Sequence, residues 1–198
     1  MTGGPCGGKT SSLEYLRTRL QDEGYTVFVV YEVPSLLIWG GADLGSLALE
    51  DFKKFEANLL NLQLHFEETF LALADSADGP SVVIYDRGLM DPAAYLTEAL
   101  WREILLENQW TEDQLCNARY DLVLHLTSAA IGAEDFYTTG DGKVRKESPA
   151  LAAELDHKVS LAWRGHHNRH VVDNSTGFSQ KQERMWTIIK NHLPPTHG

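Results

Sequence analysis

The sequence predicts an α/β fold with three layers, in which a parallel sheet lies between helices. Short apolar runs rich in β-branched and aromatic residues alternate along the chain with longer stretches of helical periodicity. This alternation is typical of parallel sheets, because each crossover between parallel strands needs a helix. A glycine-rich segment at residues 3–8, and polar residues directly after the apolar runs, predict a ligand site at the carboxyl ends of the strands.

The periodicity also predicts where the elements lie. The expected strands cover residues 25–33, 81–85, 121–127 and 170–173, and the expected helices cover 9–23, 47–74, 92–108, a segment starting at Thr111, 150–167 and 180–192. Residues 133–148 are polar, Gly-rich and charged, which favours a mobile lid over a core element. We expect one domain over residues 1–193, with 194–198 as a tail or the start of a linker.

The glycine-rich segment fits the phosphate-binding pattern G-x-x-x-x-G-K-[ST], and an expected helix follows it directly. Glycines let consecutive backbone N–H groups turn toward an anion, and Lys9 adds a positive charge for the β- and γ-phosphates. A plain Gly-rich turn is the competing interpretation, and the following helix argues against it. The nucleotide-binding residues predicted from this motif are Gly3, Gly4, Pro5, Cys6, Gly7, Gly8, Lys9, Thr10 and Ser11.

The segment that leads into this loop is short. In phosphate-binding loops of this kind a buried strand enters the loop from the middle of the sheet. Only Met1 and Thr2 precede Gly3 in the sequence. We therefore expect the first strand of a P-loop NTPase fold to be missing, with a gap at the centre of the sheet and poor stability. A loop without its usual anchor is the alternative.

Asp86 and Thr10 form the predicted Mg²⁺ site. Asp86 follows the expected strand 81–85, a position from which a carboxylate reaches Mg²⁺ directly or through water, and Thr10 offers a hydroxyl group. An ordinary aspartate in a turn is the alternative. Arg87 lies beside Asp86 and is expected to hold either a substrate phosphate or the Asp86 carboxylate.

Three further residues are candidates for chemistry at the same edge of the sheet. Glu32, at the end of the expected strand 25–33, is a candidate general base or substrate-orienting group, and a salt-bridged or helix-capping glutamate is the alternative. Arg145 is the candidate lid cation, within the tight basic cluster 143–146, which could equally be solvated surface. Asn174 is placed to border a nucleobase, and a simple turn with a helix cap at Ser179 is the competing interpretation.

Composition excludes several classes of function. The net charge of −11 argues against a nucleic-acid partner, which needs clustered Lys and Arg. No transmembrane segment or signal peptide is apparent, because the longest apolar runs have the length of strands. Two cysteines do not make a disulfide framework. A cytoplasmic location follows as the default, with peripheral association at membranes as an option.

The motifs together resemble a known family. The segments that carry the resemblance are Gly3–Ser11, Tyr31-Glu32-Val33-Pro34, Asp86-Arg87-Gly88 and Val171-Val172-Asp173-Asn174, with Phe178 and Lys181. They resemble the NadR/TRPL-translocation-defect type of AAA P-loop domain, which is nucleoside-kinase-like. The resemblance implies a kinase-like fold that binds a purine triphosphate, GTP or ATP, with Mg²⁺ as cofactor. It also implies that Thr10 and Asp86 hold the Mg²⁺ and that Arg145 supplies the lid charge.

Two functions remain open at this point. The first is an enzyme, an NTPase or a small-molecule kinase, in which Lys9, Glu32, Asp86, Arg87 and Arg145 are the catalytic residues. In the bacterial branch of the family the acceptor is nicotinamide riboside. The second is a GTP-dependent regulatory or trafficking module that binds nucleotide and phosphoinositide with little turnover, as the eukaryotic branch implies. The glutamate and the Asp-Arg pair favour the enzyme, since a pure binder needs no general base.

Overall fold

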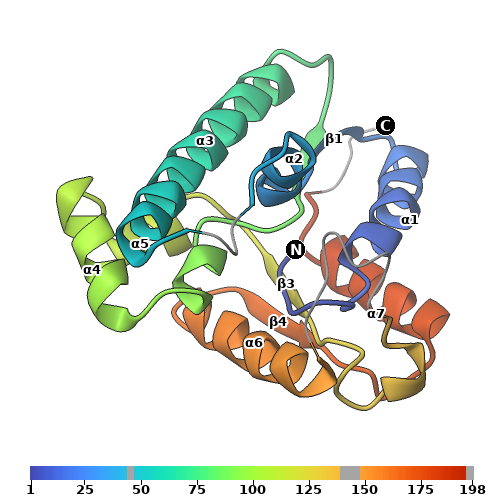
Figure 1. The fold of residues 1–198 in the computed structure, drawn as a ribbon. Coiled ribbons are helices and arrows are strands. Elements are labelled where there is room, and N and C mark those ends of the chain that lie inside the picture. The colour runs from blue at the N-terminus through green and yellow to red at the C-terminus, as the bar shows by residue number, and fades with distance from the viewer. Residues whose placement is uncertain (44–46, 139–147, 195–198) are drawn as a thin grey trace.

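The computed structural model describes residues 1–43, 47–138 and 148–194 as an α/β fold (Figure 1). The strands are β1 (Thr26–Val30), β2 (Ser81–Tyr85), β3 (Val123–Leu126) and β4 (Arg169–Val172). The helices are α1 (Lys9–Asp22), α2 (Val33–Trp39), α3 (Leu49–Asp75), α4 (Glu98–Glu107), α5 (Glu112–Cys116), α6 (Pro149–Ala162) and α7 (Phe178–Lys190), with 3₁₀ turns η2 (Asp91–Ala94) and η3 (Glu134–Phe136).

The strands form two parallel pairs that the first two residues connect. β1 pairs with β2, and β3 pairs with β4. Between the pairs, Thr2 forms a parallel bridge with His125, and Met1 hydrogen-bonds the end of β2 through the Tyr85 carbonyl. The N-terminus accordingly lies in the middle of the molecule (Figure 1). The predicted α/β class is confirmed.

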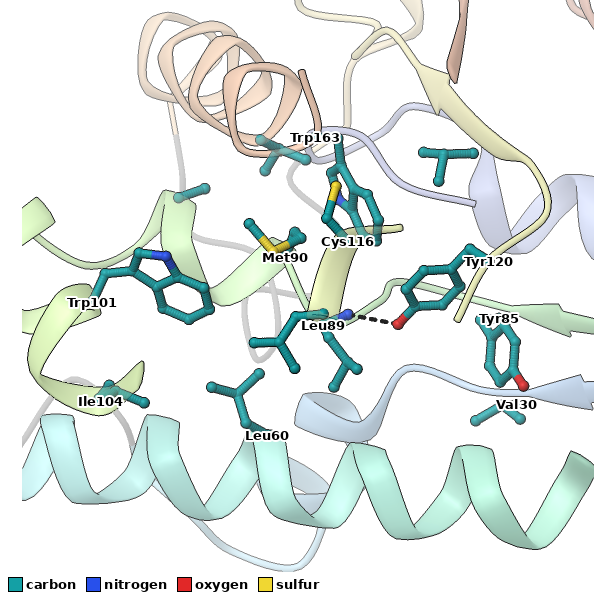
Figure 2. Close-up of a cluster of buried hydrophobic side chains, with 14 residues drawn as sticks. Val30, Leu60, Tyr85, Leu89, Met90, Trp101, Ile104, Cys116, Tyr120 and Trp163 are labelled. Atoms are coloured by element: carbon teal, nitrogen blue, oxygen red, sulfur yellow. Dashed lines mark hydrogen bonds between the residues drawn. The ribbon is translucent and has the colours of Figure 1, made fainter. Parts of the chain in front are cut away.

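Two apolar clusters, one on each face of the strands, make the arrangement three-layered. On one face, α1 and α7 cover the strands, and the cluster includes Leu16, Met185 and Leu124. On the other face, α3, α4 and α6 enclose the second cluster. Figure 2 shows Leu60 of α3 pointing toward Leu89, while the Leu89 amide donates to the Tyr120 hydroxyl at 2.9 Å. Helices on both faces are what a parallel sheet requires, because both of its surfaces are apolar.

The structure differs from the sequence-based boundaries in several places, and the helix expected over 150–167 ends already at Ala162. The strand expected over 25–33 ends at Val30, because Pro34 occupies the first turn of the short helix α2, a position that suits proline. The helix expected over 92–108 is divided into η2 and α4, and Thr97 caps the second part by accepting from the Leu100 amide. The helix cap weighed at Ser179 is wrong, since α7 starts at Phe178 after Gly177 without a side-chain cap.

Among the described residues, none of the helices combines the length and the apolar character that crossing a bilayer requires.

Candidate functional site

The glycine-rich loop is packed closely against the carboxyl end of β3, which explains why glycine is needed there. A Cβ atom on Gly3 would lie 2.1 Å from the Leu126 carbonyl oxygen, and one on Gly7 would lie 2.6 Å from the same atom. Gly3 also has a φ of 135° and Gly8 a φ of 86°, conformations that L side chains disfavour. A side chain at either position would clash with the strand and displace the loop. The curvature of the loop therefore requires glycine at these positions.

Cys6 adopts the left-handed region as well, with a φ of 56°. A non-glycine residue in this region carries a modest strain, and such strain is concentrated at functional sites. Gly8 then precedes α1 directly, so that the N-terminus of this helix opens into the loop. The free N–H groups and the dipole of a helix start favour an anion at this position.

Lys9 is the first residue of α1, and its side chain is folded back over the loop. The Nζ atom donates to the carbonyl oxygens of Gly3 and Gly4, at 3.0 Å in both cases. Only 8% of the residue is exposed. Burial, followed by the nearby charge of Arg87, lowers the pKa of Lys9 to about 8. The ammonium group is therefore held at the loop by carbonyl dipoles that an anion could replace.

Thr10 and Asp86 meet across the loop and the end of β2. The Thr10 hydroxyl donates to Asp86 Oδ2 at 3.1 Å. Asp86 is 2% exposed, and its other oxygen, Oδ1, is buried with no hydrogen-bond partner among the described residues. A buried carboxylate oxygen without a partner is costly, and a bound cation is one way to satisfy it.

Glu32 and Arg87 form an ion pair beside this carboxylate. Arg87 Nε donates to Glu32 Oε1, and the Ser35 hydroxyl donates to Glu32 Oε2 at 3.0 Å. Burial by itself would raise the pKa of Glu32, but the charges of Arg87 and Lys9 and these hydrogen bonds outweigh it and lower the pKa to about 2. Arg87 has a φ of 74°, a second strained position at the site. In this structure Glu32 is therefore a salt-bridged glutamate, which was one of the two interpretations of its position in the sequence.

Asn174 lies at the end of β4, and its side chain is engaged within the protein. Its Nδ2 donates to the carbonyl oxygens of Ser128 and Ile131, each at 2.8 Å, and its Oδ1 accepts from Lys181 Nζ at 2.7 Å. Lys181 also donates to the Gly7 carbonyl at 3.2 Å, which ties α7 to the loop. A hydrogen bond from the Asn174 amide to a nucleobase would have to replace one of these contacts.

Comparison with known proteins agrees with this geometry. A sequence model of a family described as an AAA domain matches residues 1–181. The chain belongs to this AAA-domain family. A search of curated proteins finds no match. Among solved structures, this AAA domain is similar to deoxyadenosine kinase from M. mycoides with bound dATP, with a TM-score of 0.53 and 15% identity, over 96% of this chain and 97% of the other. The similarity establishes a nucleoside-kinase-like P-loop fold.

Asp91 is a site residue of the AAA domain that sequence reasoning missed. Its Oδ1 accepts from the Thr2 hydroxyl at 2.7 Å and from Arg87 Nη1 at 3.5 Å, and its Oδ2 accepts from the Gly88 amide at 2.9 Å. It is 2% exposed. Asp91 thus links Arg87 to Thr2, which directly precedes the phosphate-binding loop. In sequence it looks like an ordinary Asp-Pro at the start of a helix, so no local signal marks it.

Asp156 was also missed, although a signal was present. It lies on the apolar face of α6, at helical spacing from Ala152 and Val159. Its Oδ1 accepts from the Gly4 amide at 2.8 Å and from the Ser128 amide at 2.9 Å, and His125 Nε2 lies 3.3 Å from Oδ2. A charged residue within an apolar helical stripe is the pattern that would have identified it. Its contact with the Gly4 amide supports the loop directly.

The remaining predicted positions are less informative. Arg145, the candidate lid cation, lies outside the described residues, as does most of the predicted lid. Pro5 lies within the loop, where its carbonyl accepts from the buried Ser128 hydroxyl. Ser11 lies on the first turn of α1, with an exposed side chain. In the ranges that the structure covers, no group of three or more His, Cys, Asp or Glu side chains is arranged to hold a metal ion on its own.

Proposed function

We propose that this AAA domain is a Mg²⁺-dependent enzyme that binds a purine nucleoside triphosphate and transfers its terminal phosphoryl group to a hydroxyl group of a small acceptor. The observation that carries the proposal is the Glu32–Arg87 ion pair beside Lys9 and Asp86. A module that only binds nucleotide needs the loop, the lysine and a metal ligand. It has no need of a partly buried carboxylate and guanidinium pair beside them.

The phosphate-binding role rests on the loop and on Lys9. The loop amides and the N-terminus of α1 provide donors for the phosphate oxygens. Lys9 Nζ exchanges its carbonyl partners in the loop for the β- and γ-phosphates. Because each phosphate oxygen accepts more strongly than a neutral carbonyl, this exchange is favourable.

The residues present fit a magnesium ion. Asp86 has a buried oxygen without a partner among the described residues, and its other oxygen already contacts the Thr10 hydroxyl. These are the oxygen ligands that Mg²⁺ takes, usually one or two carboxylates together with phosphates and water. Thr10 and Asp86 would hold the ion, and when bound it would neutralise charge on the phosphates.

Glu32 orients the acceptor and accepts its proton. With a pKa of about 2, the carboxylate is ionised at neutral pH and can accept a hydrogen bond from the acceptor hydroxyl. It is a weak base in this geometry. Phosphoryl transfer passes through a loose transition state, so its rate depends little on the strength of the base. Most of the catalysis comes from positioning the reactants and stabilising charge. Arg87 holds Glu32 and adds a positive charge near the transferred group.

A turnover assay tests this proposal. The protein is incubated with Mg²⁺ and ATP or GTP, alone and with purine nucleosides or nicotinamide riboside, and nucleoside diphosphate is measured. Adenine nucleosides are first in the panel because the structural relative is a deoxyadenosine kinase. We expect one acceptor to stimulate turnover, and Glu32→Gln to remove the stimulation. Tight GTP binding with no turnover on any acceptor would contradict the proposal and favour the GTP-dependent, phosphoinositide-binding module.

A further inference from the structure

Helix α3 carries a stripe of polar residues on the side that faces the interior. Glu56, Gln63 and Glu67 follow one another at helical spacing, which places them on one face of the helix. Their exposed fractions are 4%, 6% and 1%. Polar groups in such positions are normally hydrogen-bonded, because their removal from water otherwise costs free energy. The partners of each of these residues therefore indicate what the residue is for.

Gln63 and Glu67 have partners within the protein. Gln63 Nε2 donates to Glu67 Oε1 at 3.1 Å, and the Tyr120 hydroxyl donates to the same oxygen at 2.6 Å. Arg119 Nε donates to Glu67 Oε2 at 2.8 Å. Both carboxylate oxygens of Glu67 are thus paired, so the fold itself accounts for this part of the stripe.

Glu56 differs from them, because its Oε2 atom is buried and has no hydrogen-bond partner among the described residues. The charge of Arg87 acts on this carboxyl group, but burial outweighs that charge and raises the pKa of Glu56 to about 7. A buried carboxyl group that lacks a partner and titrates near neutral pH is a candidate for a functional role.

Glu56 lies near the ion pair of Glu32 and Arg87. Leu60, one turn further along α3, points toward Leu89, which follows Arg87 closely in the chain (Figure 2). Arg87 binds Glu32, and the helix α2, which begins directly after Glu32, packs against α3. The unpaired carboxyl group is accordingly close to the residues that we assign to orienting the acceptor.

The charges around Glu56 make this region acidic. Arg87 is shared by Glu32 and by Asp91, whose Oδ1 lies 3.5 Å from Nη1. Lys9, the other cation that acts on Glu32, donates to the carbonyl oxygens of the loop. Both cations are already engaged, and an ionised Glu56 adds a negative charge. An anionic group is therefore disfavoured here, whereas a neutral or cationic group that donates a hydrogen bond is favoured.

We propose that Glu56 determines specificity by accepting a hydrogen bond from a hydroxyl or N–H group of the phosphoryl acceptor, and that this acceptor is a non-anionic molecule with several such donors, such as a nucleoside. The inference rests on the phosphoryl transfer proposed above. Glu32 binds the hydroxyl group that receives the phosphoryl group, and Glu56 binds a second donor of the same molecule. Two carboxylates from different elements then fix the acceptor at two points, which orients it for transfer.

Acceptor kinetics of Glu56→Gln test the inference with the full chain. Glutamine keeps the size of the side chain and resembles the protonated acid, so the variant should fold. The acceptor is whichever of adenosine, deoxyadenosine and nicotinamide riboside stimulates turnover at saturating Mg²⁺-nucleotide. We expect its KM to rise at least about tenfold and kcat to change less than about threefold. Glu68→Gln, at an exposed position of the same helix, is the control and should leave both constants unchanged.

The pH dependence of this KM separates acceptor binding from a structural role. With a pKa of about 7, the ionised fraction of Glu56 rises from about one tenth at pH 6 to about nine tenths at pH 8. KM should accordingly fall about tenfold over this interval in the wild type and stay constant in Glu56→Gln. Arg87 and Glu32 keep their charges, because their pKa values lie far above and far below this interval. Saturating nucleotide keeps Lys9 charged.

The 5′-monophosphate of the same acceptor tests the charge argument. We expect it to be at least about a hundredfold poorer as an acceptor, because like charges brought together cost several kcal/mol. An unchanged KM in Glu56→Gln, an equal pH dependence of KM in both proteins, or equal use of the monophosphate would overturn the inference and leave phosphoryl transfer standing. Turnover that none of the acceptors stimulates would overturn both.

Urea unfolding provides a readout that needs no activity. The folded-state pKa of Glu56 is raised from its usual value of 4.5 to about 7, so its contribution to stability is fully present below pH 4.5 and is lost as the pH rises through about 7. Between pH 5 and pH 8, the folding equilibrium constant of the wild type should fall at least about tenfold more than that of Glu56→Gln. Equal changes in the two proteins would show that Glu56 has a partner within the fold, and would overturn the inference.

Discussion

The Thr10 hydroxyl and the Asp86 carboxylate lie 3.1 Å apart, although they are separated by 76 positions in the sequence. Thr10 lies on the first turn of α1, and Asp86 directly follows β2. The parallel arrangement of the strands brings the start of α1 and the end of β2 to the same edge of the sheet. The second oxygen of Asp86 is buried and has no partner among the described residues. The pair therefore offers a binding position for a cation, which would contact the unpaired Asp86 oxygen.

Asp86→Asn should remove the Mg²⁺ dependence of nucleotide binding. The amide keeps the shape but loses the negative charge that a hard cation requires. We expect the affinity for ATP or GTP with Mg²⁺ to fall at least about tenfold, to the level measured without Mg²⁺. Calorimetric titration measures both affinities. Asp78→Asn, in the exposed turn before β2, serves as the control. An Asp86→Asn protein that still binds more tightly with Mg²⁺ would exclude Asp86 as a ligand.

Nucleotide affinity should fall as the pH rises through about 8. Burial lowers the pKa of Lys9 to about 8, so the free protein loses this charge in a range where a normal lysine keeps it. Bound phosphates favour the charged form, and binding above pH 8 should therefore take up a proton. Calorimetry in buffers of different ionisation enthalpy measures this uptake.

Lys9→Arg provides the matched control for this pH dependence. An arginine stays protonated over the whole pH range. The nucleotide affinity of the variant should therefore not change with pH, even if it is lower than that of the wild type. If nucleotide affinity falls equally with pH in both proteins, another group titrates. Lys181, whose pKa is also lowered to about 8, is then the next candidate.

Glu32→Gln should slow phosphoryl transfer by about 10²-fold, because the acceptor hydroxyl is no longer well oriented, while leaving nucleotide binding within about twofold. The glutamine keeps the size of the side chain and loses the charge that orients the acceptor hydroxyl and pairs with Arg87. Because the pKa of Glu32 is lowered to about 2, protonation of this group should not reduce activity between pH 5 and 8. Single-turnover kinetics separate the two steps. A variant with unchanged transfer would leave Glu32 a purely structural partner of Arg87.

The stability of the protein in acid should depend on the same glutamate. The folded-state pKa of Glu32 lies below its usual value of 4.5, so its contribution is fully present above that value and is lost as the pH falls toward about 2. The free energy of unfolding of the wild type should consequently decline more steeply below pH 4.5 than that of Glu32→Gln. Urea titrations at several pH values measure the difference, and parallel curves would contradict the ion pair with Arg87.

Asp156→Ala should destabilise the fold and loosen the phosphate-binding loop. Removal of the carboxylate leaves the buried Gly4 and Ser128 amides without their acceptor, at about 1–3 kcal/mol for each unpaired group. Urea unfolding measures the loss, and nucleotide affinity should fall with it. Glu154→Ala on the same helix, where the side chain is exposed, should change stability by less than about 0.5 kcal/mol. Equal effects of the two substitutions would refute this role of Asp156.

Gly3→Ala should abolish nucleotide binding, because its Cβ would lie 2.1 Å from the Leu126 carbonyl oxygen and its φ is 135°. The backbone atom cannot move aside without displacing β3. Gly165→Ala is the matched control, since nothing lies within 4 Å of its Cβ position. Thermal unfolding and titration with Mg²⁺-ATP should distinguish the two variants. Retained binding in Gly3→Ala would show that the loop can adopt another shape.

The sequence by itself determined the class of the fold, the phosphate-binding loop and most element positions. Local patterns carry this information, because the apolar period of 2 or 3.6 residues and the spacing of glycines before Lys9 depend on neighbours in the chain. The short helix α2 and the division between η2 and α4 were missed, since proline ends one element as readily as it begins another.

Only the tertiary structure decided how the site residues engage one another. It showed that Glu32 is bound to Arg87, that Asn174 is occupied by the chain's own carbonyls, and that Asp91 and Asp156 hold the loop. These contacts join segments far apart in the sequence, so local patterns do not identify the partners, although the place of Asp156 in an apolar helical stripe marks that residue.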